Sequence, residues 1–275
     1  MNRESIGTKT WKTVVSLIFA ILALIPIVWM IALSLKHQGT AFNGVSSYFI
    51  PPYTIENYIK LTLSSKIMLW MLNSVVVAVI TTFFTITFTA MAAFALSRIR
   101  FRLNKFMYTL FIIGLLIPTE ATIIPLYITI NKFDMVDTFA GIILPCIASP
   151  LCIVILKNFF DSIPQDLIDS ANLDGCGWFR SFWDIVLPLS KTAMSAISIF
   201  TFVGIWNNYL WPFLVLTTEE KFTLPVGIPV FNSSYSADYV LPMTANAIAS
   251  IPIIIVFLIF EKQLVKGITM SGIQG

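Results

Sequence analysis

The chain has 275 residues, of which 57% are hydrophobic and only 11% are charged, and its mean hydropathy is +0.86. Because soluble domains carry about 25% charged residues, this composition excludes an ordinary soluble domain and predicts an integral membrane protein. The net charge of +3 indicates nothing about nucleic acid in such a chain, and we expect no nucleic-acid partner. The three cysteines (Cys146, Cys152 and Cys176) lack metal-ligand spacing, and the single histidine, His37, excludes a multi-histidine metal site.

Several apolar stretches are long enough for the roughly 20 residues that a membrane-spanning helix needs. There are six of them: 14–35, 67–96, 106–128, 139–159, 192–216 and 240–260. No small-residue cleavage site follows the first stretch, so we expect it to be a retained helix and not a removed signal peptide. The predicted fold class is therefore an all-α membrane protein with six transmembrane helices.

Lysine and arginine are unequally divided between the two sides of the membrane that six spans define. Twelve lie in the N-terminal segment, the second-to-third and fourth-to-fifth connections and the tail, against five in the other connections. The positive-inside rule therefore predicts a multi-pass protein of the cell membrane with both termini and the 162–191 segment in the cytosol. The external segment 36–66 is expected to lie on the outer membrane surface or, alternatively, to dock an external partner.

The second predicted span ends in small residues and is followed by an arginine cluster. Small residues allow close helix packing, and Arg98, Arg100 and Arg102 are expected to anchor the helix at the interface. In the third span, Glu120 lies between Pro118 and Pro125, which are expected to bend the helix. An intramembrane carboxylate by default marks a transport path or a polar partner. Glu120 is therefore expected to lie on a translocation pathway, to bond another helix or to reach external water.

The 162–191 segment is predicted to form two short helices around a glycine hinge. The first would cover Pro164–Leu173 with Ser162 as its N-cap, and Gly175 would end it in a left-handed C-terminal cap. The second would carry an aromatic face and end at a proline: Trp178, Phe179, Phe182, Trp183, Val186 and Pro188. Such a pair of helices at a membrane face predicts a docking element.

Amides and aromatic rings cluster at the end of the fifth predicted span. They lie in the run Trp206-Asn207-Asn208-Tyr209-Leu210-Trp211-Pro212, where they flank a proline, and the candidate pathway residues among them are Trp206, Asn207, Asn208 and Tyr209. They are expected either to present a polar, stackable surface to a sugar-like solute or to pack helices and anchor them at the interface. The tail after the sixth span is short and rich in glycine.

A specific motif in the 162–191 segment resembles the EAA loop of the inner-membrane permease subunits of ABC importers. The pattern is Asp169-Ser170-Ala171, three residues, Gly175, nine residues, and Ile185-x-Leu187-Pro188. Asp stands where the family usually has Glu, and Ser replaces the first Ala. The run Asn73-Ser74…Ala92-Ala93-x-Ala95-x-Ser97-Arg98, the Trp206-Asn207…Pro212 pattern and the tail are similar to carbohydrate permeases of the maltose and glycerol-phosphate type. The resemblance covers about residues 11–275.

This resemblance implies the type I ABC importer permease fold, with a segment 1–66 and a transmembrane domain 67–275 containing the loop at 162–191. It implies a coupling helix that contacts a separate ATPase through the loop residues Asp166, Asp169, Ser170, Ala171, Asp174, Gly175, Ile185, Leu187 and Pro188. It also supports a substrate pathway at the 206–209 cluster, beside the Glu120 that the intramembrane carboxylate itself indicates, and implies a tail at the ATPase interface through Gly267, Gly272 and Gln274.

The implied partners are an ATP-binding cassette ATPase dimer, a second and homologous permease, an external solute-binding protein and lipid. The chain has no GxxxxGK[ST] phosphate loop, so ATP and Mg²⁺ are expected on the partner ATPase, and this chain is expected to be a non-catalytic sugar permease without a cofactor. The alternatives are a permease for another polar solute (a polyol, glycerol phosphate or an amino acid), a secondary transporter, or an intramembrane enzyme centred on Glu120. A single intramembrane carboxylate argues against a proton relay.

Overall fold

The computed structural model describes residues 6–40, 44–232 and 238–271, and side chains up to residue 261. The described chain is helical, without strands. Its contacts divide it into two units, Met1–Met68 with Gly227–Ile251 and Leu69–Val226 with Pro252–Gly275.

The first unit is built around the end of α1 (Ile6–Ser34). The segment after it contains a 3₁₀ turn, Val45–Phe49, and a short helix, α2 (Glu56–Ser64). The Asn57 amide on α2 donates to the carbonyls of Ser34 and Lys36 at 3.1 and 2.7 Å, so α2 satisfies carbonyls that the end of α1 leaves free. The described part of the 36–66 segment is therefore partly helical and hydrogen-bonded to the end of α1.

The second unit begins with α3 (Ile67–Arg98), a single helix without a break. It continues with α4 (Asn104–Leu116), α5 (Thr119–Lys132), α6 (Phe139–Ile147) and α7 (Pro150–Asp161). The loop helices α8 (Gln165–Leu173), α9 (Trp178–Ser181) and α10 (Leu187–Leu189) follow, with a π-helical stretch, Phe182–Val186, before α10. The remaining helices are α11 (Lys191–Trp206), α12 (Leu210–Val215), the 3₁₀ turn Glu219–Lys221, α13 (Leu224–Gly227), the 3₁₀ turn Ile228–Phe231 of the first unit, and α14 (Val240–Ser271), which runs through both units.

Four helical stretches in the described residues are long and apolar enough to cross a membrane, and the number rises to six if each of two bent pairs is one span. The four are Thr10–Ser34, Ile67–Arg98, Phe139–Asp161 and Val240–Glu261. The bent pairs are Asn104–Leu116 with Thr119–Lys132, at 104°, and Trp178–Leu189 with Lys191–Trp206, at 79°. The predicted bend of the third span at Pro118 is present, and the predicted fifth span, 192–216, is interrupted between Trp206 and Leu210.

The chemistry of proline and of polar residues explains these breaks. Pro118 has no N–H for a helix running through it, and the preceding Ile117 is extended. The predicted fifth helix ends at Trp206, because Asn207 and Asn208 interrupt it before α12 starts at Leu210. Apolar length alone therefore does not show where the helices bend.

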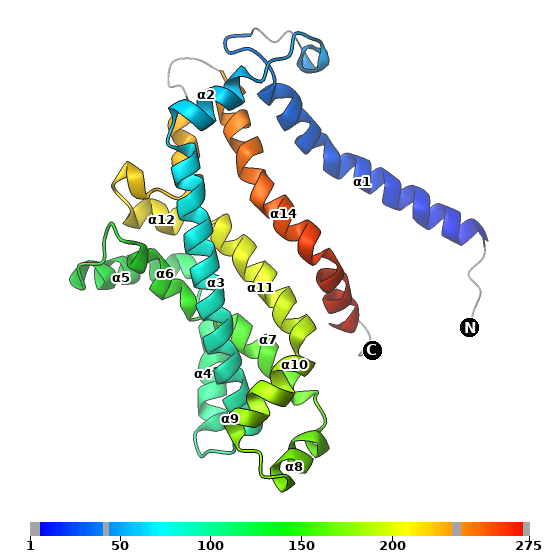
Figure 1. Ribbon diagram of the computed structural model, residues 1–275, viewed down its shortest axis with the longest axis vertical. Coiled ribbons are helices and arrows are strands. Elements are labelled where there is room, and N and C mark those ends of the chain that lie inside the picture. Colours follow the sequence, from blue (N-terminus) through cyan, green and yellow to red (C-terminus); the bar gives the residue numbers. More distant parts are fainter. Residues whose placement is uncertain (1–5, 41–43, 233–237, 272–275) are drawn as a thin grey trace. The chain divides into compact units, whose positions relative to one another are not determined.

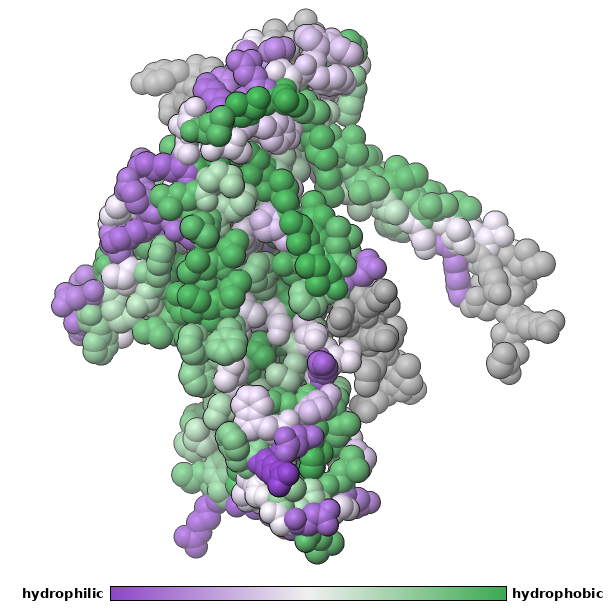
Figure 2. All heavy atoms as spheres, viewed as in Figure 1, coloured by the Kyte–Doolittle hydropathy of each residue, from purple (hydrophilic) through white to green (hydrophobic). Residues whose placement is uncertain are grey.

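Two groups of buried apolar side chains hold the second unit together. One lies near the loop helices and includes Phe94, Leu156, Phe160, Ile168 and Val186. The other brings α6 and α12 together through residues that include Ile142, Trp211 and Val215. Figure 2 shows hydrophobic residues along the middle of this unit and hydrophilic residues at the end where α8 and α9 lie. An apolar middle of this kind suits a helix bundle in lipid.

Candidate functional site

The helix α8 lies at one end of the second unit, beside α9 and α10 (Figure 1). Its buried residues are Ile168, which belongs to the apolar group near the loop helices, and Ala171. The opposite face carries Asp166, Asp169, Ser170 and Leu173 at helical spacing, all exposed, and Leu173 is 90% exposed. Such an amphipathic helix, fixed on one side and open on the other, has the form of a docking element.

The C-terminal end of α8 is closed by a Schellman motif. Gly175 has φ +82°, its N–H donates to the Asn172 carbonyl at 3.0 Å, and the Cys176 N–H donates to the Ala171 carbonyl at 2.9 Å. These bonds satisfy carbonyls left free at the helix end, and the left-handed backbone favours glycine. The predicted glycine cap is confirmed by this geometry.

The N-terminal end of α8 differs from the prediction. Ser162 is the C-cap of α7, and its hydroxyl donates to the Phe159 carbonyl at 2.6 Å. Pro164 stands at the N-cap of α8 without a side-chain cap bond. The predicted N-cap role of Ser162 was wrong, because its hydroxyl bonds a carbonyl behind it and not an N–H ahead of it.

The connection from α7 to α8 is held by Arg98, the last residue of α3. Its guanidinium donates to the Gln165 side-chain oxygen at 2.6 Å and to the carbonyls of Ile163, at 2.7 Å, and Phe160. The Arg98 side chain is buried, with 9% of the residue exposed. Arg98 was expected to anchor α3 at the membrane interface, and in the structure it is buried and hydrogen-bonded to the loop.

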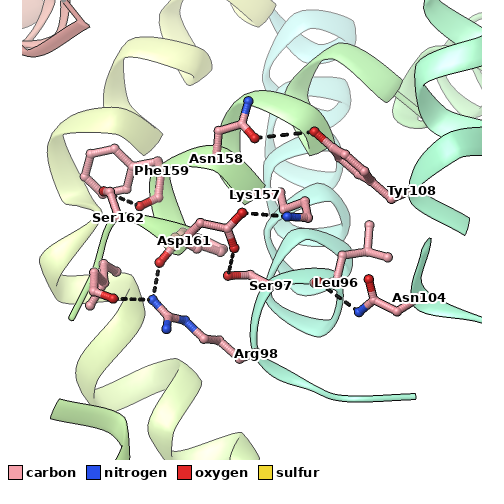
Figure 3. A network of polar contacts seen from close by, with 12 residues as sticks. Leu96, Ser97, Arg98, Asn104, Tyr108, Lys157, Asn158, Phe159, Asp161 and Ser162 are labelled. Carbon is pink, nitrogen blue, oxygen red and sulfur yellow. Dashed lines mark hydrogen bonds and ion pairs between the residues drawn. The ribbon is translucent and has the colours of Figure 1, made fainter. Parts of the chain in front are cut away.

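A second set of contacts fastens the same junction (Figure 3). The carboxylate of Asp161 accepts from the Ser97 hydroxyl at 2.6 Å and from the Lys157 ammonium at 2.5 Å. Lys157 also lies 4.7 Å from the ring centre of Tyr108, an arrangement that adds cation–π attraction. The end of α3, the start of α4 and the end of α7 therefore share one polar network.

The second loop helix is confirmed, but its aromatic face is divided. Phe182 and Val186 are buried, and Phe182 lies 5.1 Å from Phe94 between ring centres. The other aromatic residues, Trp178, Phe179 and Trp183, are exposed. Pro188 does not end the helix, which runs to Leu189. The remaining predicted loop residues lie as follows: Asp174 and Pro188 are exposed, and Ile185 and Leu187 are half-buried against the apolar group.

Three helix breaks meet around a cleft of about 800 Å³. The breaks are those between α4 and α5, between α6 and α7, and between α11 and α12, and each contributes lining residues, including Pro118, Ser149 and Asn208. Broken helices inside a membrane are tolerated where the freed backbone lines a cavity, and transporters place their solute sites at such breaks. The cleft is therefore the candidate solute site.

Glu120 and Asn208, which are 88 positions apart in the sequence, both line this cleft. Glu120 lies in the first turn of α5, where the helix dipole favours a negative charge. Its carboxylate makes no hydrogen bond with another described residue. Trp211 was not predicted as a pathway residue, yet it lines the cleft and its buried indole N–H has no hydrogen-bond partner among the described residues.

The other predicted pathway residues do not line the cleft. Trp206 is 3% exposed and stacks on Phe202 at 5.9 Å, while Tyr209 stacks on Phe213 at 5.2 Å. Asn207 is exposed, outside the cleft. The tail residue Gly267 falls within α14, and Gly272 and Gln274 lie outside the described residues. Among the described residues, no group of three or more His, Cys, Asp or Glu side chains suits a metal ion.

An all-helical membrane chain with broken spans around a cleft and an amphipathic loop helix at one end belongs to the class of multi-pass transport permeases. Residues 85–270 match the family of the binding-protein-dependent transport system inner membrane component, and the chain belongs to this family. It is a permease subunit and not an enzyme.

Relatives and a solved structure agree with this assignment. The chain is 32% identical, over the full length of both proteins, to the arabinooligosaccharides transport system permease protein AraQ of Bacillus subtilis (strain 168). It is 35% identical over 205 residues, 74% of this chain and 73% of the relative, to the sn-glycerol-3-phosphate transport system permease protein UgpE of Yersinia pestis bv. Antiqua. A crystal structure of a bacterial ABC transporter involved in alginate import matches with a TM-score of 0.83 over 95% of this chain and 99% of that chain, at 21% identity. The predicted importer-permease fold is confirmed.

Proposed function

We propose that this chain translocates a sugar or oligosaccharide across the cell membrane as the permease subunit of an ATP-driven importer. The observation that carries the solute class is the cleft, which the Glu120 carboxylate of α5, the Asn208 amide between α11 and α12, and the Trp211 indole of α12 all line. Carboxylates and amides bond sugar hydroxyls, and aromatic rings pack on the apolar faces of sugars. The names of relatives such as the arabinooligosaccharide permease support the same class.

The charge of the cleft favours a neutral solute over a phosphorylated one. The residues that line the cleft include Glu120 but no lysine or arginine. Recognition of phosphate normally uses arginine or lysine, and a carboxylate repels it. A neutral polyhydroxylated solute therefore fits this subunit better than glycerol phosphate, despite the similarity to a glycerol-phosphate permease.

The energy would come from a separate ATPase pair that binds ATP and Mg²⁺ and receives the exposed face of α8. Asp166 and Asp169 supply charge on that face, and Leu167 and Leu173 supply exposed apolar contact. In this arrangement both termini are cytosolic, and the tail with Gly267, Gly272 and Gln274 reaches the same ATPase pair. Closure of the ATPases would displace α8, and the bends of 104° and 79° provide points at which the membrane helices rearrange.

The remaining proposed partners are a homologous second permease and an external solute-binding protein. Apolar side chains are exposed along α1 ahead of its buried end, including Leu17, Phe19, Leu22 and Ile25, and only lipid or another membrane subunit can cover such a surface. In the proposed division of the chain, residues 1–66 provide this helix and the external segment. Residues 67–275 provide the transport domain, with the coupling loop at 162–191.

The experiment that tests this function is purification of the tagged chain in mild detergent from its own cells, followed by reconstitution in liposomes. We expect an ATPase, a second permease and a solute-binding protein in the same fraction. Thermal shift of that binding protein across neutral sugars, sugar phosphates and amino acids would then identify the solute. Uptake driven by ATP on the ATPase side supports the proposal. A chain that purifies alone and transports on an ion gradient without ATP would refute it and establish a secondary transporter.

A further inference from the structure

The contacts of Arg98 join three helices through one side chain. Arg98 is the last residue of α3, and two of its acceptors are the carbonyls of Phe160 and Ile163, in the last turn of α7 and just beyond it. Such carbonyls carry the negative end of the helix dipole, so a cation is favoured there. The third acceptor is the side chain of Gln165, the first residue of α8. Arg98 therefore binds α7 and α8 at the same time.

Gln165 continues this chain of hydrogen bonds to the exposed face of α8. Its oxygen accepts from Arg98 at 2.6 Å, and its NH₂ group donates to the Asp169 carboxylate at 3.0 Å. A guanidinium only donates and an ionised carboxylate only accepts, so this amide orientation is the one that satisfies both neighbours. A buried cation on α3 is thereby connected to the acidic side chain at the first position of the loop motif.

The far end of α3 holds another loop in the same second unit. The Asn73 amide donates to the carbonyls of Glu220 and Phe222 at 2.8 and 2.9 Å, and the Ser74 hydroxyl accepts from the Leu224 N–H at 2.7 Å. A 32-residue helix rises about 1.5 Å per residue, so the helix is ~48 Å long, more than the ~30 Å of a bilayer core. One unbroken helix therefore contacts the 165–173 helix at one end and the 220–224 loop at the other.

We propose that Arg98 is a positioning residue that makes α8 and α3 move together, so that a displacement of α8 reaches the 220–224 loop on the opposite side of the membrane. This inference rests on the proposed docking of the ATPase on α8. With Arg98 in place, movement of α8 pulls on the guanidinium and on the end of α3. Without it, only the apolar group that includes Ile168 and Phe94 would join α8 to α3, and we expect α8 to turn about Ile163 and Pro164, between α7 and α8, with less movement of α3.

The test uses the intact complex isolated through a tag on this chain, with Mg-ATP and orthovanadate as the probe, so that no solute needs to be known. Hydrogen–deuterium exchange is measured at residues 165–173 and at residues 219–224, with and without the probe. Arg98→Gln is compared with Arg100→Gln, a matched control, because Arg100 is exposed and makes no hydrogen bond with a described residue.

In the wild type and in Arg100→Gln we expect the probe to change exchange in both segments. In Arg98→Gln the change at 165–173 remains, and the change at 219–224 falls by about tenfold, within the range of coupling between distant sites. If Arg98→Gln responds at 219–224 as the wild type does, the proposal is overturned. If the wild type itself shows no response at 165–173, the docking of the ATPase on α8 fails, and this inference fails with it.

A second set of variants remains decisive if Arg98→Gln does not assemble. Gln165→Glu keeps an acceptor for Arg98 but removes the donor to Asp169, so the response at 219–224 should fall severalfold. Asp169→Asn in the same chain returns a donor facing the new carboxylate, and we expect it to restore the response, whereas Asp169→Asn alone does not raise it. If the response at 219–224 in the double variant is no larger than in Gln165→Glu, the proposed coupling through Arg98, Gln165 and Asp169 is overturned. A merely structural role of these residues predicts no such rescue.

Discussion

The glycine at the end of α8 allows a prediction whose size follows from the backbone alone. A Cβ added at Gly175 would meet no atom within 4 Å, so Gly175→Ala creates no clash within the chain. The cost comes from φ +82°, a left-handed conformation that disfavours a residue with a Cβ by about 1–2 kcal/mol. Reduced freedom of the unfolded chain returns about 0.4–1 kcal/mol. The net loss is ~1 kcal/mol, or roughly fivefold in the opening of the cap.

Hydrogen–deuterium exchange of the full complex measures this opening directly. The N–H groups of Gly175 and Cys176, which donate to carbonyls of α8, should exchange roughly fivefold faster in Gly175→Ala. Gly177→Ala is the matched control, because Gly177 also has no atom within 4 Å but an ordinary φ of −76°. Gly175→Asn should exchange more slowly than Gly175→Ala, since asparagine tolerates the left-handed region. Equal exchange in the two alanine variants would refute the argument from φ.

Three further predictions concern packing, charge and the cleft. Gly141→Ala should lower the free energy of unfolding by about 1–3 kcal/mol and lower the melting temperature, because its Cβ would stand 2.3 Å from the Met135 carbonyl oxygen. The control Gly204→Ala, whose Cβ would meet no atom within 4 Å, should be neutral or slightly stabilising. Equal losses of stability in the two variants would contradict this overlap. The Asp137 carboxylate accepts from a lysine and from two threonines, which hold its pKa well below its usual range of about 4. The stabilisation that the ionised Asp137 provides is therefore complete above about pH 4 and is lost only as the pH falls further. The melting temperature of Asp137→Ala should accordingly lie below that of the wild type by the same number of degrees at pH 7 and at pH 5. A difference in melting temperature that is already gone at pH 5 would refute the lowered pKa of Asp137. Trp211→Phe keeps an aromatic side chain but removes the indole N–H, which has no hydrogen-bond partner among the described residues. Sugar uptake by the reconstituted complex should therefore fall about fivefold to tenfold, while its basal ATP hydrolysis is unchanged. Unchanged uptake would show that this N–H does not bind the solute.

The loop at 162–191 was largely predictable because its signals are local. A proline at the start of α8 and a glycine beyond its end mark the helix by rules that involve only neighbouring residues. The partners of Arg98 lie 62–67 positions away, and an arginine after an apolar helix looks the same whether it faces lipid headgroups or a buried carbonyl. Contacts of this kind depend on how distant helices pack, and a single sequence does not show this packing.

The cleft was predictable only in part for the same reason. Glu120 and Asn208 stood out because polar residues are costly in apolar segments, but nothing in the pattern indicated that they share one cavity. Trp206 was expected in the pathway and is buried in packing, whereas Trp211 lines the cleft. Both tryptophans lie in apolar surroundings five residues apart, and the break at Asn207, which alters the helical phase, decides which of them faces the cavity.

The hydrogen bonds between α3 and the 219–224 loop have a consequence for how the sequence of this protein can change during evolution. Trp70 and Asn73 donate to main-chain carbonyls of Glu219, Glu220 and Phe222, and every residue type supplies such a carbonyl. Side chains at the two glutamate positions can therefore be exchanged without removing these bonds. The sequence of that loop can therefore change in descendants of this permease while the helix that holds it stays the same.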